Sequence, residues 1–153
     1  MDDTIYLVTG APGSGKSTAL AAFLRLNSEY LAFDIDWLAV TASNLAGRDV
    51  IFDESTSLPY RLLWFEILWC VCWNQRQPIL FSPLDPRQTA DIGQLGWHPT
   101  IRWLLLDCND GVRRERLGRR RDWTQRMVGE AVDDAAYLRE TIPNSIDTGA
   151  YAA

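Results

Sequence analysis

The stretch "GAPGSGKST", Gly10 to Thr18, fits the pattern G-x-x-x-x-G-K-[ST]. A β-rich run, Thr4–Thr9, comes directly before it, and a helix is expected to begin near Lys16. Glycines let backbone N–H groups curl around phosphate oxygens, and the start of a helix adds partial positive charge. The stretch therefore predicts a loop that holds the phosphates of a nucleoside triphosphate.

The residues expected to bind the nucleotide all belong to this loop. They are Gly10, Pro12, Gly13, Ser14, Gly15, Lys16, Ser17 and Thr18. Lys16 is expected to bridge the β- and γ-phosphates, and Ser17 to bind Mg²⁺. The alternative is a glycine-rich turn that begins a helix, with Lys16 as a solvated charge.

Short β-rich runs alternate with longer helical segments along the whole chain. This pattern is typical of parallel strands joined by crossover helices, and it predicts one α/β domain over residues 1–153. The expected strands are Thr4–Thr9, Tyr30–Asp34, Pro78–Ser82, Ile101–Asp107 and Ser145–Asp147.

Capping residues mark where the later helices begin. Ser57 predicts the start of a helix that ends near Arg76. "DPRQ" places Asp85 as a cap with a proline in the first turn and a glutamine at the capping-box position. "DWTQ" repeats the cap at Asp122 and predicts a helix to about Glu140.

One helical stretch, Leu62–Trp73, is apolar on all sides and interrupted only by Glu66. We expect this helix to be enclosed between the sheet and another layer. An ionised carboxylate in such a helix needs a partner or a cavity, so Glu66 is a candidate substrate residue.

Composition narrows the function classes. Twenty acidic and fifteen basic residues give a net charge of −5, which disfavours nucleic acid as a partner. The N-terminus lacks the pattern of a signal peptide, and no apolar run reaches the roughly 20 residues of a membrane span. We expect a cytoplasmic protein that does not bind membranes.

The three cysteines are expected to be core thiols, and the single histidine, His98, to lie in a loop.

The third expected strand lacks the acid that many nucleotide hydrolases carry there. Ser82 stands at that position, and Asp85 is better explained as a helix cap. A GTPase is disfavoured because neither N-K-x-D nor D-x-x-G occurs in the sequence. The acid that organises the metal must then come from another strand.

The second strand supplies two candidates in "LAFDIDWL". Asp34 and Asp36 alternate with apolar residues, so both are expected to project from one face of the strand end. In an open parallel sheet this end lies beside the loop after the first strand. Asp34 is expected to hold Mg²⁺ through water, and Asp36 to accept the proton of an attacking hydroxyl. The alternative is that both merely cap the next helix.

Taken in order, these motifs resemble the small P-loop kinases of the nucleoside monophosphate kinase superfamily, and the resemblance covers nearly the whole chain. It is strongest to the small-metabolite branch: shikimate kinase, gluconate kinase and chloramphenicol phosphotransferase. The resemblance implies a three-layer P-loop NTPase fold with a five-stranded parallel sheet, order 2-3-1-4-5, and helices on both faces. It also implies that "DID" serves magnesium with Asp34 and the substrate with Asp36.

The same resemblance implies a short arginine-rich lid around residues 116–124. Arg116 and Arg120 resemble the pair that stacks on adenine and clamps phosphate in these kinases, with Arg119 beside them. The alternative is a basic, solvated helix end. The sequence after "NSIDTG" lacks the final helix that is common in such kinases. A partner chain that covers the sheet, and hence a homodimer, is therefore one of the expectations left open.

The sequence thus predicts a kinase that moves the γ-phosphate of Mg·ATP to a hydroxyl of a neutral small molecule, such as a nucleoside, sugar or antibiotic. Asp36, Lys16 and Arg120 are the expected catalytic residues. Substrate contacts are expected from Asp36, Asp53, Glu54 and Glu66. The alternatives are a nucleoside monophosphate kinase and a non-catalytic, nucleotide-binding regulatory protein.

Overall fold

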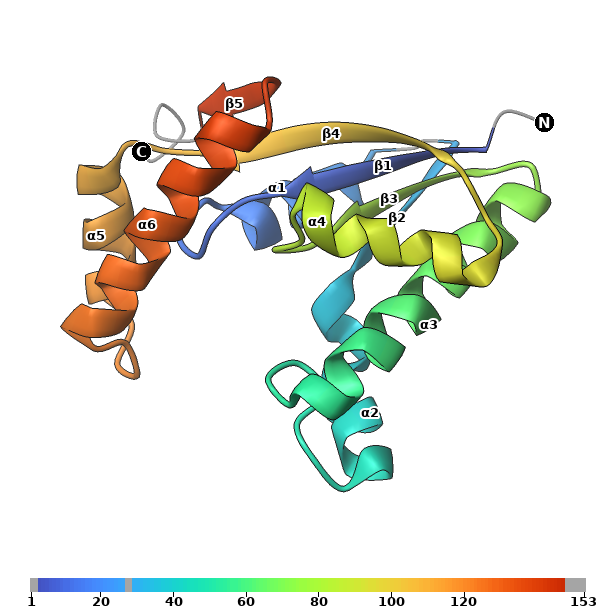
Figure 1. Ribbon diagram of the computed structural model, residues 1–153. Helices are drawn as coiled ribbons and strands as arrows, with labels where there is room; N and C mark the ends of the chain where they lie inside the picture. Colours follow the sequence, from blue (N-terminus) through green and yellow to red (C-terminus); the bar gives the residue numbers. More distant parts are fainter. Residues whose placement is uncertain (1–2, 27–28, 148–153) are drawn as a thin grey trace.

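A parallel sheet with the strand order β2-β3-β1-β4-β5 forms the centre of the molecule in the computed structural model, which describes residues 3–26 and 29–147 (Figure 1). The strands are β1 (Thr4–Thr9), β2 (Tyr30–Asp34), β3 (Gln77–Phe81), β4 (Thr100–Asp107) and β5 (Ser145–Asp147). All four neighbouring pairs are parallel, so every connection between them must cross over the sheet.

The predicted α/β class and the order β2-β3-β1-β4 are confirmed. The fifth predicted strand is only three residues long and pairs with β4 from Leu105↔Ser145 to Asp107↔Asp147. The described end of the chain therefore lies beside the carboxyl end of β4.

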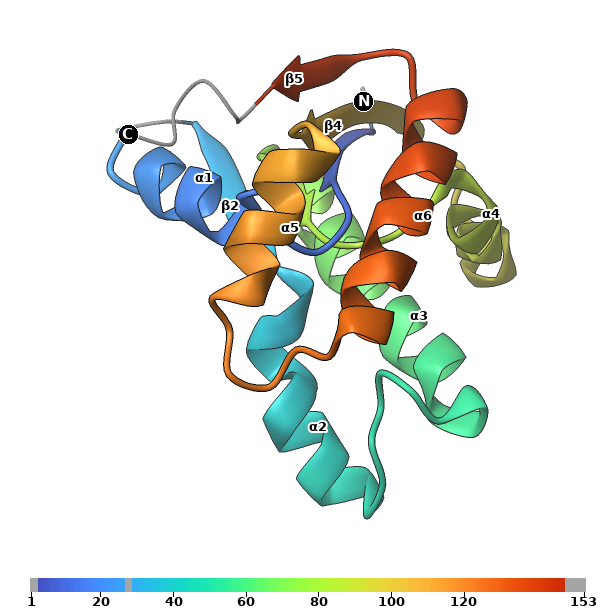
Figure 2. The same ribbon diagram turned by 90° about the vertical axis from the view of Figure 1, so that its left-hand side faces the viewer.

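Helices cover both faces of this sheet, as Figure 2 shows almost end-on. Alternate residues of β1 pack in opposite directions: Ile5 and Leu7 join the core under α3 (Glu54–Trp73), while Val8 packs with Leu20 of α1 (Lys16–Phe23). α6 (Gln125–Thr141) covers Leu105 on the face of α3. Two apolar layers thus enclose the sheet.

α3 begins one turn before the predicted start and ends at Trp73. Asp53 caps it, accepting a hydrogen bond from the Ser55 N–H at 2.9 Å, which explains the earlier start. The prediction that this helix is enclosed on all sides is wrong. Leu63 is 42% exposed and Trp73 69% exposed, because only one face of α3 packs against the sheet.

Two other caps were tested by the structure. The capping box at Asp85 is confirmed: its side chain accepts from the N–H groups of Arg87 and Gln88, and it opens the short helix α4 (Pro86–Thr89). The cap predicted at Asp122 is wrong. Thr124 caps α6 instead, accepting from Met127 N at 3.2 Å, because residues 121–122 still belong to the turn that precedes α6.

The remaining short helices complete the fold. They are η1 (Ile35–Leu38), α2 (Ala39–Ala46), η2 (Ala90–Leu95) and α5 (Asp110–Gly118). No helix in the described part of the chain is long and apolar enough to cross a bilayer. The prediction of three core thiols is wrong for Cys70, which lies on the exposed side of α3; Cys72 and Cys108 are buried.

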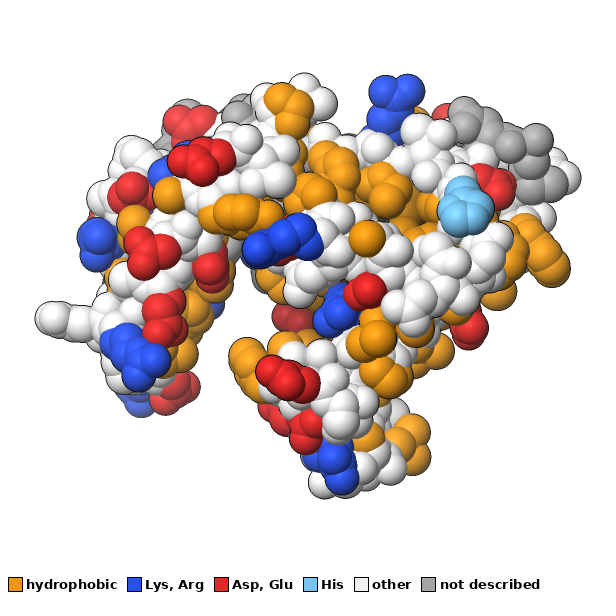
Figure 3. Space-filling model, in the orientation of Figure 1, with side chains coloured by type: hydrophobic (Ala, Val, Ile, Leu, Met, Phe, Trp, Pro, Cys, Tyr) orange, Lys and Arg blue, Asp and Glu red, His pale blue; other side chains and the backbone are white. Residues whose placement is uncertain are grey.

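Two arms project from the same side of the sheet (Figure 1). One is formed by α2 and the first turns of α3, and the other by α5, α6 and the turn between them, residues 119–124. Figure 3 shows an open hollow between the two arms, which we call the cleft. The site predicted from the sequence lies where these arms leave the sheet.

The buried face of α3 should dominate stability. Leu68 is fully buried, so Leu68→Ala should lower the free energy of unfolding by about 2 to 5 kcal/mol through the cavity it leaves. Leu63→Ala, on the exposed side of the same helix, should cost less than about 1 kcal/mol. Urea unfolding of both variants compares them, and equal losses would contradict the packing described here.

Candidate active site

The loop between β1 and α1 adopts a shape that only glycine permits at key positions. Gly13 and Gly15 have φ values of +81° and +92°, in the left-handed region that glycine favours. At Gly10, a Cβ would lie 2.4 Å from the backbone oxygen of Leu106 and 2.5 Å from Oγ of Ser14. The sequence pattern is thus explained by backbone geometry and close packing.

α5 packs directly against the outside of this loop. A Cβ on Gly13 would lie 3.1 Å from Cγ of Leu117 and 3.3 Å from Cγ of Arg113, both in α5. The first two turns of α5 therefore support the loop from behind.

Arg116 of the predicted lid, and Arg113 just before that lid, hold the loop from this rear side. Arg113 is fully buried and donates to the carbonyl oxygen of Pro12 at 2.6 Å. Arg116 donates to the carbonyl oxygen of Gly13 at 3.1 Å. Arg116, predicted to contact the nucleotide, is therefore engaged with the loop, and Arg113 is a loop-supporting residue that the prediction missed.

The other two predicted arginines lie near the end of α5. Arg119 is largely exposed and pairs with Glu115 one turn earlier. Arg120 places its guanidinium 5.7 Å from the ring centre of Trp123, and it is close enough to Lys16 to lower the pKa of that residue. Of the two, Arg120 is the one whose charge affects Lys16.

Lys16 is the only lysine of the 153 residues. Its Nζ donates to the carbonyl oxygen of Gly10 and lies 3.5 Å from that of Ala11. Burial lowers its pKa from 10.5 to about 8; Asp34 and Asp36 oppose this shift, whereas Arg113 and Arg120 add to it. Lys16 thus lies between two carboxylates and two guanidinium groups.

The two aspartates reach Lys16 by a different geometry from the one predicted. β2 ends at Asp34 and residues 35–38 form the η1 turn, so the expected alternation along a strand is wrong. Asp34 caps this turn by accepting from Asp36 N at 2.9 Å. Asp34 therefore does cap the turn, and the tight turn still leaves both carboxylates close to Lys16.

Asp36 is an exposed residue whose carboxylate is nevertheless crowded. Partial loss of solvent and the negative charge of Asp34 raise its pKa, while Lys16 partly opposes the rise. A carboxylate with a raised pKa is a better proton acceptor than an ordinary aspartate.

Tyr60 fixes the turn that carries Asp36, and sequence reasoning missed it. This buried residue of α3 donates its hydroxyl hydrogen to the carbonyl oxygen of Ile35. Burial raises the pKa of Tyr60, and the nearby Asp36 contributes to the rise. A signal was present in the sequence, since Tyr60 is a polar aromatic residue in an apolar helix.

The end of β3 carries no acid, as predicted. Ser82 is buried next to β1, where its N–H donates to Val8 O at 3.0 Å. Its hydroxyl oxygen accepts from Leu84 N at 3.3 Å. With Asp85 employed as a cap, the carboxylates nearest to the loop in this region are those after β2.

Few protein side chains near the phosphate loop could bind a metal ion. The described residues contain no cluster of three or more His, Cys, Asp or Glu side chains suited to a metal. Ser17, exposed in the first turn of α1, and the Oδ2 atom of Asp34 offer a hydroxyl and a carboxylate oxygen. This donor set fits Mg²⁺, which keeps several waters and takes the rest of its ligands from phosphates.

The predicted substrate residues do not all come together. Asp53 and Glu54 lie at the start of α3 in the arm beside the cleft, where Asp53 serves as the cap and pairs with Arg48 at 3.7 Å. Glu66 is exposed more than three turns further along α3 and lies beside Leu31, near the beginning of β2. The structure therefore does not bring Glu66 to the end of β2 that carries Asp34 and Asp36.

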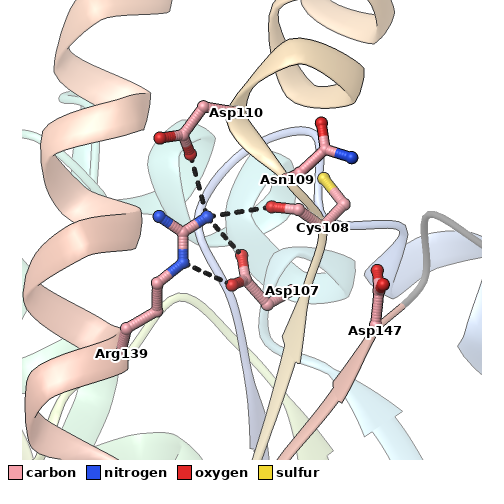
Figure 4. A pocket seen from close by; sticks show the side chains of 6 residues that line it. All are labelled: Asp107, Cys108, Asn109, Asp110, Arg139 and Asp147. Atoms are coloured by element: carbon pink, nitrogen blue, oxygen red, sulfur yellow. Dashed lines mark hydrogen bonds and ion pairs between the residues drawn. The ribbon is translucent and has the colours of Figure 1, made fainter.

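A cavity of about 410 Å³ opens at the carboxyl ends of β4 and β5. It is lined by Asp107, Cys108, Asn109, Asp110, Arg139 and Asp147 (Figure 4). Arg139 of α6 lies between two of these acids, donating to Asp110 at 2.8 Å and to both oxygens of Asp107. The cavity adjoins the loop through the buried Cys108, whose sulfur lies 3.6 Å from Gly13 O.

Solved structures with a similar fold are known. A sugar kinase from a Janibacter species aligns with a TM-score of 0.65 at 15% identity, covering 98% of this chain and 87% of the other. The tunicamycin resistance protein of Deinococcus radiodurans aligns with a TM-score of 0.65 at 19% identity, covering 95% and 86%. This chain has the fold of the small P-loop kinases.

A third likeness extends over part of a longer protein. A chain of the Pnkp1/Rnl/Hen1 RNA repair complex aligns with a TM-score of 0.62 at 16% identity, covering 90% of this chain but only 45% of that one. No protein-family profile matches the sequence, and no curated protein matches it in sequence. The comparisons therefore establish the P-loop kinase fold, and the chemistry must be argued from the site.

The lowered pKa of Lys16 can be measured directly. With ¹³Cε-labelled lysine, the protein should give one side-chain signal that titrates at about 8, against 10.5 in the urea-unfolded chain. Because the unfolded chain then binds more protons between these values, stability should rise with pH across that window. A folded-state midpoint near 10.5 would contradict the burial described here.

Proposed function

We propose that this protein is an ATP-dependent kinase that phosphorylates a hydroxyl group of a small molecule. The observation that carries the proposal is the convergence of Lys16, Asp34 and Asp36 between the phosphate loop and the end of β2, with Arg120 nearby. A loop that only holds a nucleotide has no need of a second carboxylate, beyond one for Mg²⁺, beside its lysine. The P-loop kinase fold, seen also in a sugar kinase, supports the proposal.

ATP is proposed to bind with its phosphates on residues 10–18. The N–H groups of the loop and of the first turn of α1 would bind the phosphate oxygens. The cavity beside Cys108 and Arg139 is proposed to take the nucleobase, since it lies next to the loop and has polar groups on its walls.

Ser17 and Asp34 are proposed to hold Mg²⁺, Asp34 through a water molecule. When bound, the ion would neutralise charge on the phosphates. Asp34 can serve in this way because only its Oδ1 atom is used to cap η1.

Asp36 is proposed to accept the proton of the acceptor hydroxyl as its oxygen attacks the γ-phosphorus. The new P–O bond forms as the bond to the bridging oxygen breaks, and ADP leaves. Lys16 and Arg120 would stabilise the negative charge on the transferring group. Arg119 could join them from the turn between α5 and α6, which we assign as the lid.

The acceptor is proposed to lie in the cleft between the lid and the α2–α3 arm, near Asp36 and the start of α3. A neutral molecule fits this arm best, because both of its described arginines are already paired: Arg48 with Asp53, and Arg61 with Asp91 at 2.8 Å. A nucleoside monophosphate would need a cation for its phosphate. The net charge of −5 also disfavours RNA or DNA as the acceptor.

Asp36→Asn provides the test of this chemistry. The variant should lose at least about 100-fold in kcat, because the amide cannot accept the proton. Its affinity for Mg·ATP should change by less than about threefold, since Asp36 is not assigned to the nucleotide. Release of ADP, measured with a panel of nucleosides, sugars and hydroxylated antibiotics, would report the activity.

Asp133→Asn, an exposed acid on α6, is the matched control and should behave as the unaltered protein does. An Asp36→Asn enzyme at full speed would exclude the proposed role of this residue. Turnover with nucleoside monophosphates alone would identify a monophosphate kinase. Tight nucleotide binding without turnover of any acceptor would favour a regulatory, nucleotide-binding protein.

A further inference from the structure

The phosphate loop has a rear side that must itself be hydrogen-bonded. When a loop turns its N–H groups toward an anion, its carbonyl oxygens point the other way. In this protein the carbonyl oxygens of residues 11–13 accept hydrogen bonds from arginines of α5, whereas that of Gly10 accepts from Lys16. Buried carbonyl oxygens without donors would cost free energy and let the loop relax into other shapes.

One side chain serves two of these carbonyls. Nη1 of Arg113 donates to Pro12 O at 2.6 Å and to Ala11 O at 3.3 Å. The side chain is 0% exposed, so it cannot reach a ligand in the cleft. Ala11 O also accepts from Ser14 N at 3.1 Å, which links the arginine to the tightest turn of the loop.

The charge of this buried arginine is balanced by Asp107 at the end of β4. Nη2 of Arg113 donates to Oδ1 of Asp107, and Arg139 of α6 donates to both carboxylate oxygens of the same residue. Arg139 also binds Cys108 O at 2.9 Å and Asp110 at 2.8 Å (Figure 4). Three elements, β4, α5 and α6, are thereby joined behind the loop.

We propose that Arg113 is a positioning residue that holds the phosphate loop in its nucleotide-binding shape, with Asp107 as its counter-charge. The planar fork of a guanidinium can bind two carbonyls and a carboxylate together, whereas a lysine in the same place has one nitrogen. Arg113 thus acts through the loop and not on the nucleotide. The inference rests on the proposed nucleotide-binding role of the loop, but the shape of the loop can be tested without a nucleotide.

The test compares Arg113→Lys with Arg114→Lys, an exposed neighbour on α5, in the unliganded protein. Amide hydrogen exchange at Ser14 should quicken by about tenfold or more in Arg113→Lys, because the carbonyl that it binds is no longer held. Arg114→Lys should leave this rate unchanged. In kinase assays Arg113→Lys should raise the KM for ATP by a similar factor and leave the KM for the acceptor unchanged.

Asp107→Asn is the second variant, used whether or not Arg113→Lys folds, and it should also quicken exchange at Ser14. Combined with Arg113→Lys it should add little, because both changes affect one network. Exchange at Ser14 that is equal in Arg113→Lys and Arg114→Lys would overturn the proposal. If exchange at Ser14 quickens in Arg113→Lys but the unaltered protein binds no nucleotide, the positioning role of Arg113 would be supported and the proposed function would be refuted.

Discussion

The orientation of the backbone in residues 10–18 is the constraint on which the rest of the site depends. A phosphate-binding loop has to present N–H groups on one side, so its carbonyls must find donors on the other. Here Arg113, Arg116 and Cys108 face that rear side, and the left-handed Gly13 leaves room for α5 to approach. The arm formed by α5 and α6 is therefore anchored at its base by the loop itself.

A second consequence concerns charge. Lys16 is buried among two carboxylates and two guanidinium groups, and its pKa falls to about 8 because burial outweighs the attraction of Asp34 and Asp36. The phosphates of a nucleotide would bring negative charge to this position and favour the protonated lysine. The surroundings of Lys16 therefore favour an anionic ligand, whose charge would offset part of the cost of burying the protonated lysine.

The two arms differ in how firmly their charged side chains are paired within the protein. In the α2–α3 arm, Asp53 caps a helix, and Arg48 and Arg61 are paired within the protein. At the end of the α5–α6 arm, Arg120 rests on an aromatic ring and Arg119 on a neighbouring glutamate, both near the surface. Such contacts are weak, so either arginine can leave its present partner and bind a ligand. The fold alone does not identify the acceptor, because one fold can support binding sites for many different molecules.

By itself the sequence determined the α/β class, the positions of the strands and the phosphate loop, because strand periodicity, helix caps and left-handed glycines are local properties of the chain. Only the tertiary structure decided the turn that carries Asp36, its anchor Tyr60 and the buried role of Arg113. Arg113 and Arg120 share one basic run in the sequence, yet one is buried against the loop and the other lies over Trp123 near the surface. Which role an arginine takes depends on the helix face it occupies and on what packs against that face, and no local pattern contains that information.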